Sequence, residues 1–344
     1  MGVEIEKVGD TTTVELTEAE NELYDRQIRL WGLESQKRLR TAKVLISGLN
    51  GIGAEVTKNI ILSGVNSVKL HDDKVVTEED FCSQFLASRD SLGVNRATAS
   101  IERARHLNPM VEISIDTEPL EKKNEVFFSQ FDVVVIIGSP EAEIIRIDNI
   151  CRKKNIKFFC GDVWGMFGYC CADLQKHSFL QDVVKHKIIS EPNQKVKTEI
   201  VTTAVQQELE FPPLQEVFDF DYNLPEFQRS LKRKGPAFLV LRILQKFREV
   251  FKRDPSYQTR EEDIIELTKI RDELSNENIV PLSCFSNVFS QISPTAAVVG
   301  GVLAQEVIKV ISKKEAPLCN VFLFDPETCC GFIENISAEL FKKQ

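Results

Sequence analysis

The chain has 344 residues, of which 42% are hydrophobic and 28% are charged, an ordinary composition for a globular protein with one large or two modest domains. The formal net charge of −9 argues against a general nucleic-acid-binding protein, which would be basic overall. The acidic, polar start of the chain lacks the pattern of a secretory signal peptide. No apolar run is expected to be long enough to span a membrane.

The nine cysteines are expected to remain reduced thiols, because the rest of the chain has an intracellular character. None of them forms a C-x-x-C pair, since Cys170–Cys171 and Cys329–Cys330 are adjacent residues. With only four histidines in the sequence, no zinc site and no other metal site is predicted. Burial in the core is the expected role of Cys170 and Cys171.

Residues 1–17 are rich in Glu and Thr and are predicted to be disordered. A helix is predicted to follow, because Thr17 and Glu20 have the spacing of a capping box. Gly32 is expected to end or kink this helix.

The run YDRQIRLWG lies within this predicted helix. The spacing of Tyr24, Ile28 and Trp31 places three large apolar groups on one face, while Arg26 and Arg29 lie elsewhere. From spacing alone, a salt bridge between Arg26 and the body of the protein is the favoured interpretation.

A nucleotide-binding βαβ unit is predicted between Lys43 and Asp72. An apolar, β-branched strand leads into a glycine-rich turn, an amphipathic helix follows as far as Gly64, and a second strand ends near Asp72. In such a unit the start of the helix offers N–H groups to a phosphate, and the acid can hydrogen-bond a ribose.

The turn departs from the dinucleotide fingerprint G-x-G-x-x-G. Gly48 and Gly53 occupy the outer positions, Asn50 replaces the middle glycine, and the extra glycine is Gly51. The middle glycine normally lets the backbone approach a pyrophosphate, and an Asn side chain would crowd that approach. The pattern therefore predicts the fold of the unit more firmly than a working phosphate site, and glycines that serve only chain geometry are the alternative.

Strands and helices continue to alternate after this unit, which predicts an α/β, Rossmann-like, mainly parallel sheet. Residues 176–290 are more polar and carry charge clusters, which indicates an inserted, mostly helical subdomain. The sheet domain is therefore expected from residues 18–175 and 291–344. The further predicted elements are helices 95–107, 141–154, 237–251, 261–274 and 293–312, and strands 111–115, 131–137, 156–159, 321–324 and 331–334.

Two features of this second half leave alternatives open. The basic run 232–234 could be a nuclear-import patch, although a solvated helix face is the favoured interpretation. The small residues of helix 293–312 let another backbone pack closely, either within the domain or at a subunit interface.

Four runs, YDRQIRLWGLESQKRL, VLISGLNGIGAEVTKNIILSGV, FFCGDVWGMFGY and PTAAVVGGVLAQEVIK, together resemble the ubiquitin-activating enzyme superfamily, whose adenylation domains are similar to bacterial MoeB and ThiF. Within the superfamily, the chain is most similar to the smaller, regulatory subunits of heterodimeric SUMO-activating enzymes. This resemblance implies a ThiF/MoeB-type adenylation fold and a heterodimer with a larger catalytic subunit. It also implies contact with SUMO through that complex, an insertion that contributes to the catalytic-cysteine region, and residence mainly in the nucleus.

The resemblance also implies that this chain's own nucleotide pocket is degenerate. Family members that adenylate have a G-x-G-G-x-G turn, an Asp-x-Asp pair, an Asn-Arg-Gln-Phe run, a helix Lys and a magnesium-binding Asp-Asn pair. No nucleotide or magnesium is therefore expected to bind to this chain, and both are expected in the partner's site. The corresponding residues here are Gly48, Asn50, Gly51 and Gly53 in the turn, then Asp72 with Lys74, Ser83, Arg96, and Ser139 with Pro140.

Arg26 is the residue for which the resemblance implies a catalytic role. In the family this arginine reaches from the inactive half into the ATP site of the active half, as an arginine finger does. Arg29 is the less favoured contact. For Asp72, capping of a strand end is favoured over ribose binding, because the pocket around it is degraded.

The implied function is that of a non-catalytic but obligatory subunit, which supports ATP-dependent adenylation of the SUMO C-terminus and thioester formation on the larger subunit. One alternative is a self-sufficient, MoeB-like adenylating homodimer, against which Lys74, Ser83 and Ser139 count. Another is an NAD-dependent oxidoreductase with an atypical turn, for which no histidine lies in a suggestive setting.

Overall fold

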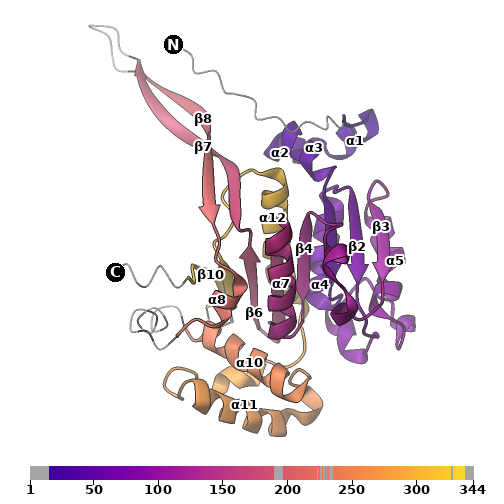
Figure 1. The fold of residues 1–344 in the computed structure, drawn as a ribbon, viewed down its shortest axis with the longest axis vertical. Coiled ribbons are helices and arrows are strands. Elements are labelled where there is room, and N and C mark those ends of the chain that lie inside the picture. The colour runs from indigo at the N-terminus through magenta and orange to yellow at the C-terminus, as the bar shows by residue number, and fades with distance from the viewer. Residues whose placement is uncertain are drawn as a thin grey trace.

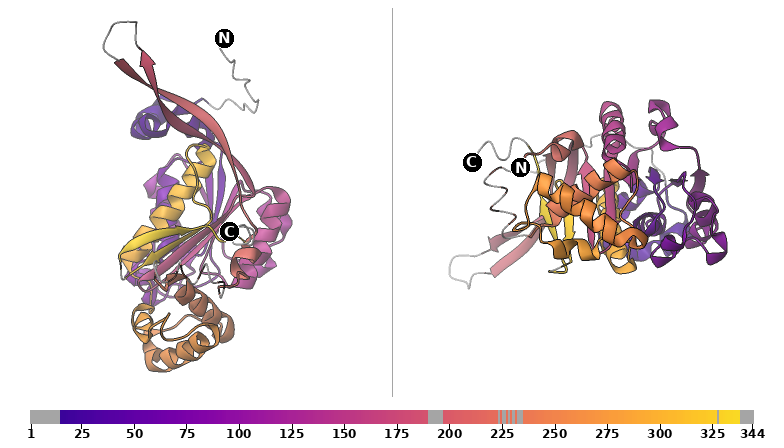
Figure 2. Two further views of the ribbon diagram at one scale, coloured as in Figure 1. Left: turned by 90° about the vertical axis from the view of Figure 1, so that its left-hand side faces the viewer. Right: turned by 90° about the horizontal axis from the view of Figure 1, so that it is seen from below.

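The computed structural model is built on one eight-stranded sheet with helices on both faces (Figures 1 and 2). It describes residues 15–189, 197–222, 224, 227, 229, 231, 235–326 and 328–337. The predicted disorder of residues 1–14 and the basic run 232–234 therefore lie outside the described residues. The strands of the sheet are β1 Lys43–Ser47, β2 Ser67–His71, β3 Glu112–Asp116, β4 Val133–Ile137, β5 Lys157–Trp164, β6 Phe167–Asp173, β9 Val321–Asp325 and β10 Cys330–Glu334.

The strand order is β10-β9-β6-β5-β4-β1-β2-β3. Strands β1 to β5 are parallel to one another, whereas β6, β9 and β10 add an antiparallel edge. The chain runs outward from β1 to β2 and β3 and returns to β4 on the other side of β1. The carboxyl ends of β1 and β4 therefore form the topological switch point, where open α/β sheets bind ligands.

The hydrophobic core has two layers, one on each face of the sheet. Successive residues of a strand point to opposite faces, so each strand contributes side chains to both layers. Helices α3, α4, α5 and α12 cover one face, and α6, α7, α8 and α10 cover the other. The helices are α1 Glu18–Leu23, α2 Asp25–Trp31, α3 Leu33–Leu39, α4 Gly51–Leu62, α5 Arg96–Leu107, α6 Glu125–Phe128, α7 Glu141–Lys154, α8 Leu214–Phe218, α10 Ala237–Phe251, α11 Arg260–Leu274 and α12 Ser293–Ser312. Short 3₁₀ helices in the loops are η1 Glu78–Cys82, η2 Arg89–Ser91, η3 Leu120–Lys122, η4 Tyr257–Thr259 and η5 Leu282–Asn287.

The N-terminal segment folds as three short helices, α1 to α3, instead of one helix with a kink. The predicted capping box is confirmed, since the Glu20 N–H donates to Thr17 Oγ1 at 3.2 Å and the Thr17 N–H donates to Glu20 Oε2 at 2.9 Å. Gly32, with φ of +91°, separates α2 from α3, so the prediction that it ends a helix is confirmed.

The insertion begins with a long two-stranded hairpin, β7 Lys176–Ile189 and β8 Lys197–Glu210, which rises away from the sheet (Figures 1 and 2). The prediction of a mostly helical insertion was wrong for this part. β-Branched residues do recur in both strands, but Lys, Asp, Glu and Gln between them obscured the strand signal. Strand β6 was also missed, whereas α10 and α11 follow the prediction to within one residue at each end.

Cys170 and Cys171 lie in β6 and are buried, as expected, with 1% and 2% of their surface exposed. Burial raises the pKa of the Cys170 thiol well above its usual value. A thiol held in its neutral form is a poor nucleophile, so packing accounts for Cys170.

Helix α12 packs closely on α4. At least one of its small residues, Gly300, therefore serves packing within the domain, which was one of the two alternatives left open by the sequence. A Cβ atom on Gly300 would lie 2.7 Å from the Glu55 Cβ and 3.2 Å from the carbonyl oxygen of Ile52. A Cβ atom on Gly301 would meet no described atom within 4 Å. Contrary to expectation, α12 is long and apolar enough to span a membrane, but 61% of that window is buried, as in a core helix.

Asp148 of α7 is buried beside Asp173 at the end of β6. Asp148 Oδ2 accepts a hydrogen bond from the Leu214 N–H at 3.0 Å, and Asp173 is ion-paired with Arg152 at 2.5 Å. Burial, followed by the charge of Asp173, raises the pKa of Asp148 to about 8. The folded protein therefore holds a proton on Asp148 that the unfolded chain releases at much lower pH.

The two neighbouring glycines of α12 predict opposite effects of the same substitution. Gly300→Ala should lower the free energy of unfolding by ~1–3 kcal/mol, because the added methyl group overlaps α4. Gly301→Ala should raise it by up to ~1 kcal/mol, because Ala favours the helix and meets open space. Urea unfolding of the two variants tests this, and equal shifts of both would contradict the α12–α4 packing.

The Asp148 carboxyl predicts a pH-dependent stability. Because its folded-state pKa is raised, its stabilising contribution declines as pH rises towards 8, by at most about 1.4 kcal/mol per pH unit. Asp148→Asn imitates the protonated form, so its stability advantage over the wild type should be larger at pH 8 than at pH 6. Urea unfolding at both pH values measures the difference, with the exposed Asp90→Asn as the control. A pH-independent difference would contradict the buried proton.

Candidate functional site

The glycine-rich turn lies at the switch point, between the end of β1 and the start of α4. Gly48 has φ of +94°, and a Cβ atom there would lie 2.2 Å from the carbonyl oxygen of Ile137 at the end of β4. A Cβ atom on Gly53 would lie 1.9 Å from the carbonyl oxygen of Gly48. Both glycines are therefore required by the chain geometry of the turn itself, whether or not a ligand binds.

Two of the first N–H groups of α4 already have side-chain acceptors within the protein. Asn50 is the N-cap, and its Oδ1 accepts a hydrogen bond from the Gly53 N–H at 3.1 Å. Gln291, just before α12, accepts from the Ile52 N–H through Oε1 at 3.4 Å. These N–H groups are the ones that a phosphate would need at this helix start.

Ser83 closes over the same turn. A Cβ atom on Gly51 would lie 2.0 Å from Ser83 Oγ, and Ser83 is buried. The neighbouring Gln84 fixes this segment by donating to the Leu49 carbonyl oxygen at 3.0 Å and to Ser100 Oγ at 2.9 Å. The position that resembles a phosphate-binding arginine therefore holds a small side chain packed against the backbone of the turn.

Asp72 and Arg96 are engaged with protein groups. The Leu49 N–H donates to Asp72 Oδ2 at 2.7 Å, and the Lys74 N–H donates to Asp72 Oδ1 at 2.8 Å. Arg96 forms an ion pair with Asp80 at 2.9 Å and lies 3.8 Å from Asp72. This geometry supports the interpretation of Asp72 as the cap of a strand end.

Ser139 follows β4 at the place where a magnesium-binding carboxylate would be needed. Its carbonyl oxygen accepts a hydrogen bond from Arg248 Nη1 at 3.3 Å. Arg248 comes from α10 of the insertion and also forms ion pairs with Asp162 at 2.6 Å and Asp254 at 2.7 Å. Its guanidinium lies over the Trp164 ring, 4.6 Å from the centroid.

Sequence reasoning missed the cluster formed by Arg248, Asp162, Asp254 and Gln291. The signal that could have indicated it is Asp162, an acid within a mainly apolar strand, and the sequence analysis did not use it. Burial disfavours the charged form of Arg248, but the two carboxylates outweigh this effect and raise its pKa. The guanidinium therefore remains charged and bound where the degenerate pocket meets the insertion.

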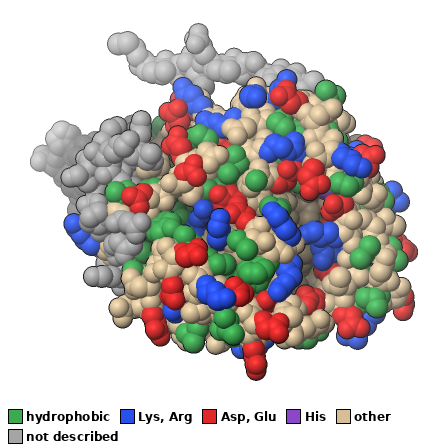
Figure 3. All heavy atoms as spheres, turned by 60° about the horizontal axis from the view of Figure 1, so that its bottom comes forward, with side chains coloured by type: hydrophobic (Ala, Val, Ile, Leu, Met, Phe, Trp, Pro, Cys, Tyr) green, Lys and Arg blue, Asp and Glu red, His purple; other side chains and the backbone are tan. Residues whose placement is uncertain are grey.

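These residues do not fit a bound nucleotide. Side-chain oxygens occupy two N–H groups at the start of α4, Asp72 is used by the backbone, and Ser139 supplies no carboxylate. No catalytic step through a nucleotide in this chain follows from such a site. On the face of the molecule that Figure 3 shows, Lys and Arg side chains lie interspersed with Asp and Glu side chains.

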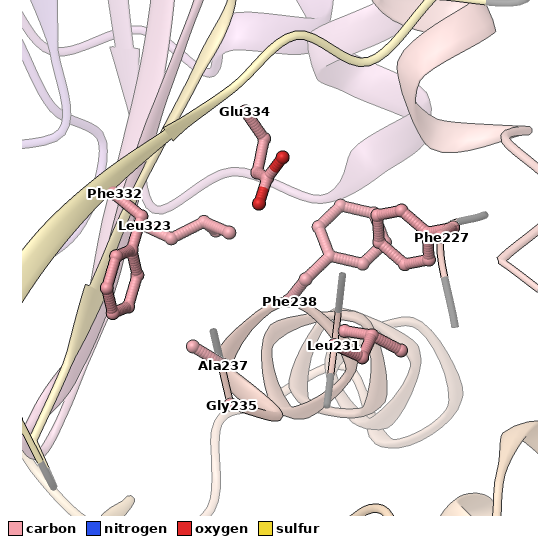
Figure 4. Close-up of a pocket in the computed structure, with 8 residues that line it drawn as sticks. All are labelled: Phe227, Leu231, Gly235, Ala237, Phe238, Leu323, Phe332 and Glu334. Carbon is pink, nitrogen blue, oxygen red and sulfur yellow. The ribbon is translucent and has the colours of Figure 1, made fainter. Parts of the chain in front are cut away.

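A separate small cavity lies between the insertion and strands β9 and β10 (Figure 4). Its volume is about 10 Å³, room for roughly one water molecule. Apart from the Glu334 carboxylate, its lining is apolar or glycine: Phe227, Leu231, Gly235, Ala237, Phe238, Leu323 and Phe332. The cavity is too small to hold a substrate.

The YDRQIRLWG helix is attached to the end of α4 by several of its side chains. Tyr24 is buried against Gly64 and accepts a hydrogen bond from Asn108 at 2.9 Å. Gln27 donates to the Leu62 carbonyl oxygen at 2.9 Å. These contacts fix the orientation of α2 and leave one of its faces uncovered.

Arg26 lies on this uncovered face and is exposed. Arg26 forms no hydrogen bond or ion pair with any described residue. The salt bridge to the body of the protein that spacing alone favoured is therefore absent among the described residues. Arg29, in contrast, is paired with Asp25 at 3.0 Å on the same helix. Of the two arginines, only Arg29 thus has a partner among the described residues.

Large apolar side chains are exposed on α2 and on the helices that adjoin it. Leu30, one turn further along α2, is 73% exposed, and Leu23 is 54% exposed. Leu33 and Leu62 are each 42% exposed on the adjoining helices. Apolar side chains gathered around one cation are typical of a surface that another protein covers.

Comparison with known proteins agrees with this architecture. The chain is 42% identical over 339 residues to SUMO-activating enzyme subunit 1 of Xenopus tropicalis, with 94% of this chain and 98% of the relative covered. It is 42% identical over 331 residues to the human protein of the same name, with 93% and 96% covered. A crystal structure of E. coli MccB with succinimide is similar in fold, with a TM-score of 0.53, 15% identity, and 92% of this chain and 72% of that chain covered. The ThiF family model matches residues 24–338, and the chain therefore belongs to the ThiF family.

Proposed function

We propose that this chain is the smaller, non-catalytic subunit of a heterodimeric SUMO-activating enzyme. It supports ATP-dependent adenylation of the SUMO C-terminus and thioester formation, both on the larger subunit. The relatives named SUMO-activating enzyme subunit 1 support the assignment, because they match nearly the full length of both chains. The observation that carries it is the contrast between an internally filled nucleotide site and an exposed Arg26 without a partner among the described residues.

Arg26 is proposed to reach the ATP site of the larger subunit. In adenylation, a carboxylate oxygen of SUMO attacks the α-phosphorus of ATP, and the bond to the leaving pyrophosphate breaks. A guanidinium held near the phosphates stabilises the negative charge that builds up in this step. Because Arg26 comes from the other subunit, the reaction becomes dependent on assembly of the heterodimer.

The surface around Arg26 suits such an assembly. Leu23, Leu30, Leu33 and Leu62 expose apolar area that a partner would bury, which would place Arg26 inside a water-excluded interface. An arginine loses less on desolvation than a lysine and offers several donors to phosphate oxygens. The same contacts would therefore both hold the subunits together and position the cation.

The remaining parts of the proposal rest on the family resemblance. The insertion, residues 176–290, is proposed to contribute to the catalytic-cysteine region of the complex. ATP and magnesium are proposed to bind only to the larger subunit, and residence mainly in the nucleus stays a prediction.

ATP–pyrophosphate exchange tests the assignment. The isolated chain should give no SUMO-dependent exchange, because its own site lacks the ligands for magnesium and phosphate. The same chain, co-expressed with the larger subunit and purified as a heterodimer, should give exchange that requires SUMO. Exchange by the isolated chain would instead favour a self-sufficient, MoeB-like homodimer.

Arg26→Ala tests the proposed role of the arginine. In the heterodimer it should lower the rate of SUMO adenylation by at least about tenfold, because one cation is lost from the phosphates. Size-exclusion chromatography should still give the heterodimer. Arg29→Ala is the matched control and should stay near the wild-type rate, because Arg29 pairs with Asp25 on its own helix. Equal rates for Arg26→Ala and the wild type would remove Arg26 from the mechanism.

A further inference from the structure

We propose that the degenerate nucleotide site works as an internal joint, in which Arg248, Asp162 and Gln291 connect the inserted helices to the start of α4. The insertion is thereby held on the carboxyl edge of the sheet by protein groups alone, without a nucleotide. This inference concerns the chain itself and stands independently of the SUMO assignment.

The first connection is made by Arg248. This side chain is 9% exposed and bridges two carboxylates, with Nη2 at 2.6 Å from Asp162 Oδ2 and Nε at 2.7 Å from Asp254 Oδ1. Asp162 belongs to β5 of the sheet, whereas Arg248 belongs to α10 and Asp254 to the loop that follows it. The planar fork of the guanidinium suits two separate acceptors, which the single ammonium of a lysine does not match.

The second connection runs from Asp162 to α4 through Gln291. Gln291 Nε2 donates to Asp162 Oδ1 at 3.0 Å, and its Oε1 accepts from the Ile52 N–H at 3.4 Å. A continuous path of polar contacts therefore leads from α10 through the end of β5 to the first turn of α4. At the α4 end of this path, Gln291 takes up an N–H group that a phosphate at this helix start would need.

Two further contacts close the site from the side of the insertion. Trp164 Nε1 donates to Asp254 Oδ1 at 2.8 Å, while the Arg248 guanidinium covers the indole ring. Ser256 Oγ donates to Glu79 Oε1 at 3.3 Å, which links the loop after α10 to η1 beside the glycine-rich turn. The loop after α10 therefore contacts two segments of the sheet domain that are far apart in the sequence, Glu79 in η1 and Trp164 at the end of β5.

If Arg248 and Asp162 act as a buried ion pair, single and double substitutions of the pair should differ in how strongly they disturb the protein. Removing one partner of such a pair leaves an uncompensated buried charge, whereas replacing both partners by neutral groups is far less costly. Arg248→Met would leave Asp162 buried without its cation. Arg248→Met combined with Asp162→Asn would remove both charges of this pair. Asp254, whose side chain is 47% exposed, loses its cation in the single and the double variant alike, so the double variant should be less disturbed than Arg248→Met alone.

Arg242 offers a matched control on the same helix. Its side chain is 17% exposed, forms an ion pair with Glu141 of α7 at 2.6 Å and donates to the Phe218 carbonyl oxygen of α8 at 2.9 Å. Among the described residues, none of its hydrogen bonds or ion pairs reaches the glycine-rich turn. Arg242→Met therefore removes a comparable anchor of α10 without affecting the proposed joint.

Hydrogen exchange of the full chain, measured by mass spectrometry, tests the joint. Arg248→Met should speed exchange by at least about tenfold at the start of α4 as well as in the 252–258 loop. It should also shift the fluorescence of Trp164 in a Trp31→Phe background, where Trp164 is the only tryptophan. Arg242→Met should speed exchange near α7 and α8 and leave the start of α4 and the Trp164 signal unchanged.

The double variant and the nucleotide complete the test. The Arg248→Met/Asp162→Asn chain should return towards wild-type exchange at the start of α4, and millimolar Mg-ATP should leave the wild-type chain unaffected. Arg248→Met effects confined to α10, or protection of residues 48–53 by Mg-ATP, would overturn the inference. Pyrophosphate exchange by the heterodimer tests the proposed function separately, so the two can fail independently.

Discussion

The first N–H groups of α4 need acceptors, and how the protein supplies them governs the rest of the site. A helix cannot satisfy its own first N–H groups, so a side chain, water or ligand must do so. Here Asn50 and Gln291 provide these acceptors from within the chain. The Ile52 and Gly53 N–H groups are thereby no longer free donors for a phosphate. The surrounding cations and carboxylates are then free to take structural roles, as Arg96 does with Asp80 and Arg248 does with Asp162.

The fold could be predicted because the retained residues of the nucleotide-binding pattern are those that hold the backbone. Gly48 and Gly53 allow two close backbone approaches, and Asp72 and Gln84 bind main-chain groups of the turn. Such residues are needed for the βαβ unit with or without a ligand. The altered residues, Asn50, Ser83 and Ser139, are those at which the resemblance places ligand contacts, and their side chains or neighbouring backbone now contact other parts of the protein. This division explains why one pattern predicted the architecture and a degenerate pocket together.

The internal filling of the site could not be predicted in the same way. Arg248, Asp254 and Gln291 come from segments far from the glycine-rich turn, and no periodic pattern links a side chain in α10 to the end of β5. The hairpin β7–β8 was missed for a different reason, since its polar residues resemble those of a solvated helix. Strand β6 followed β5 too closely for the apolar run to indicate two antiparallel strands. Local pattern thus determined the separate elements, while the contacts between distant elements required the structure.

Two arginines of this chain differ in their burial and in the partners that the described residues give them. Arg248 is covered, flanked by two carboxylates and stacked on an indole, so its charge is already neutralised within the molecule. Arg26 is exposed on a helix that Tyr24 and Gln27 hold in place, with apolar leucines around it. Because the Arg26 guanidinium stays hydrated, its charge lowers the stability of the folded chain little. In a covered interface it would need a negative partner, since an unpaired buried charge is strongly disfavoured. The leucines favour that covering and the guanidinium requires an anion, so this surface as a whole fits a partner that presents negative charge next to the docking site.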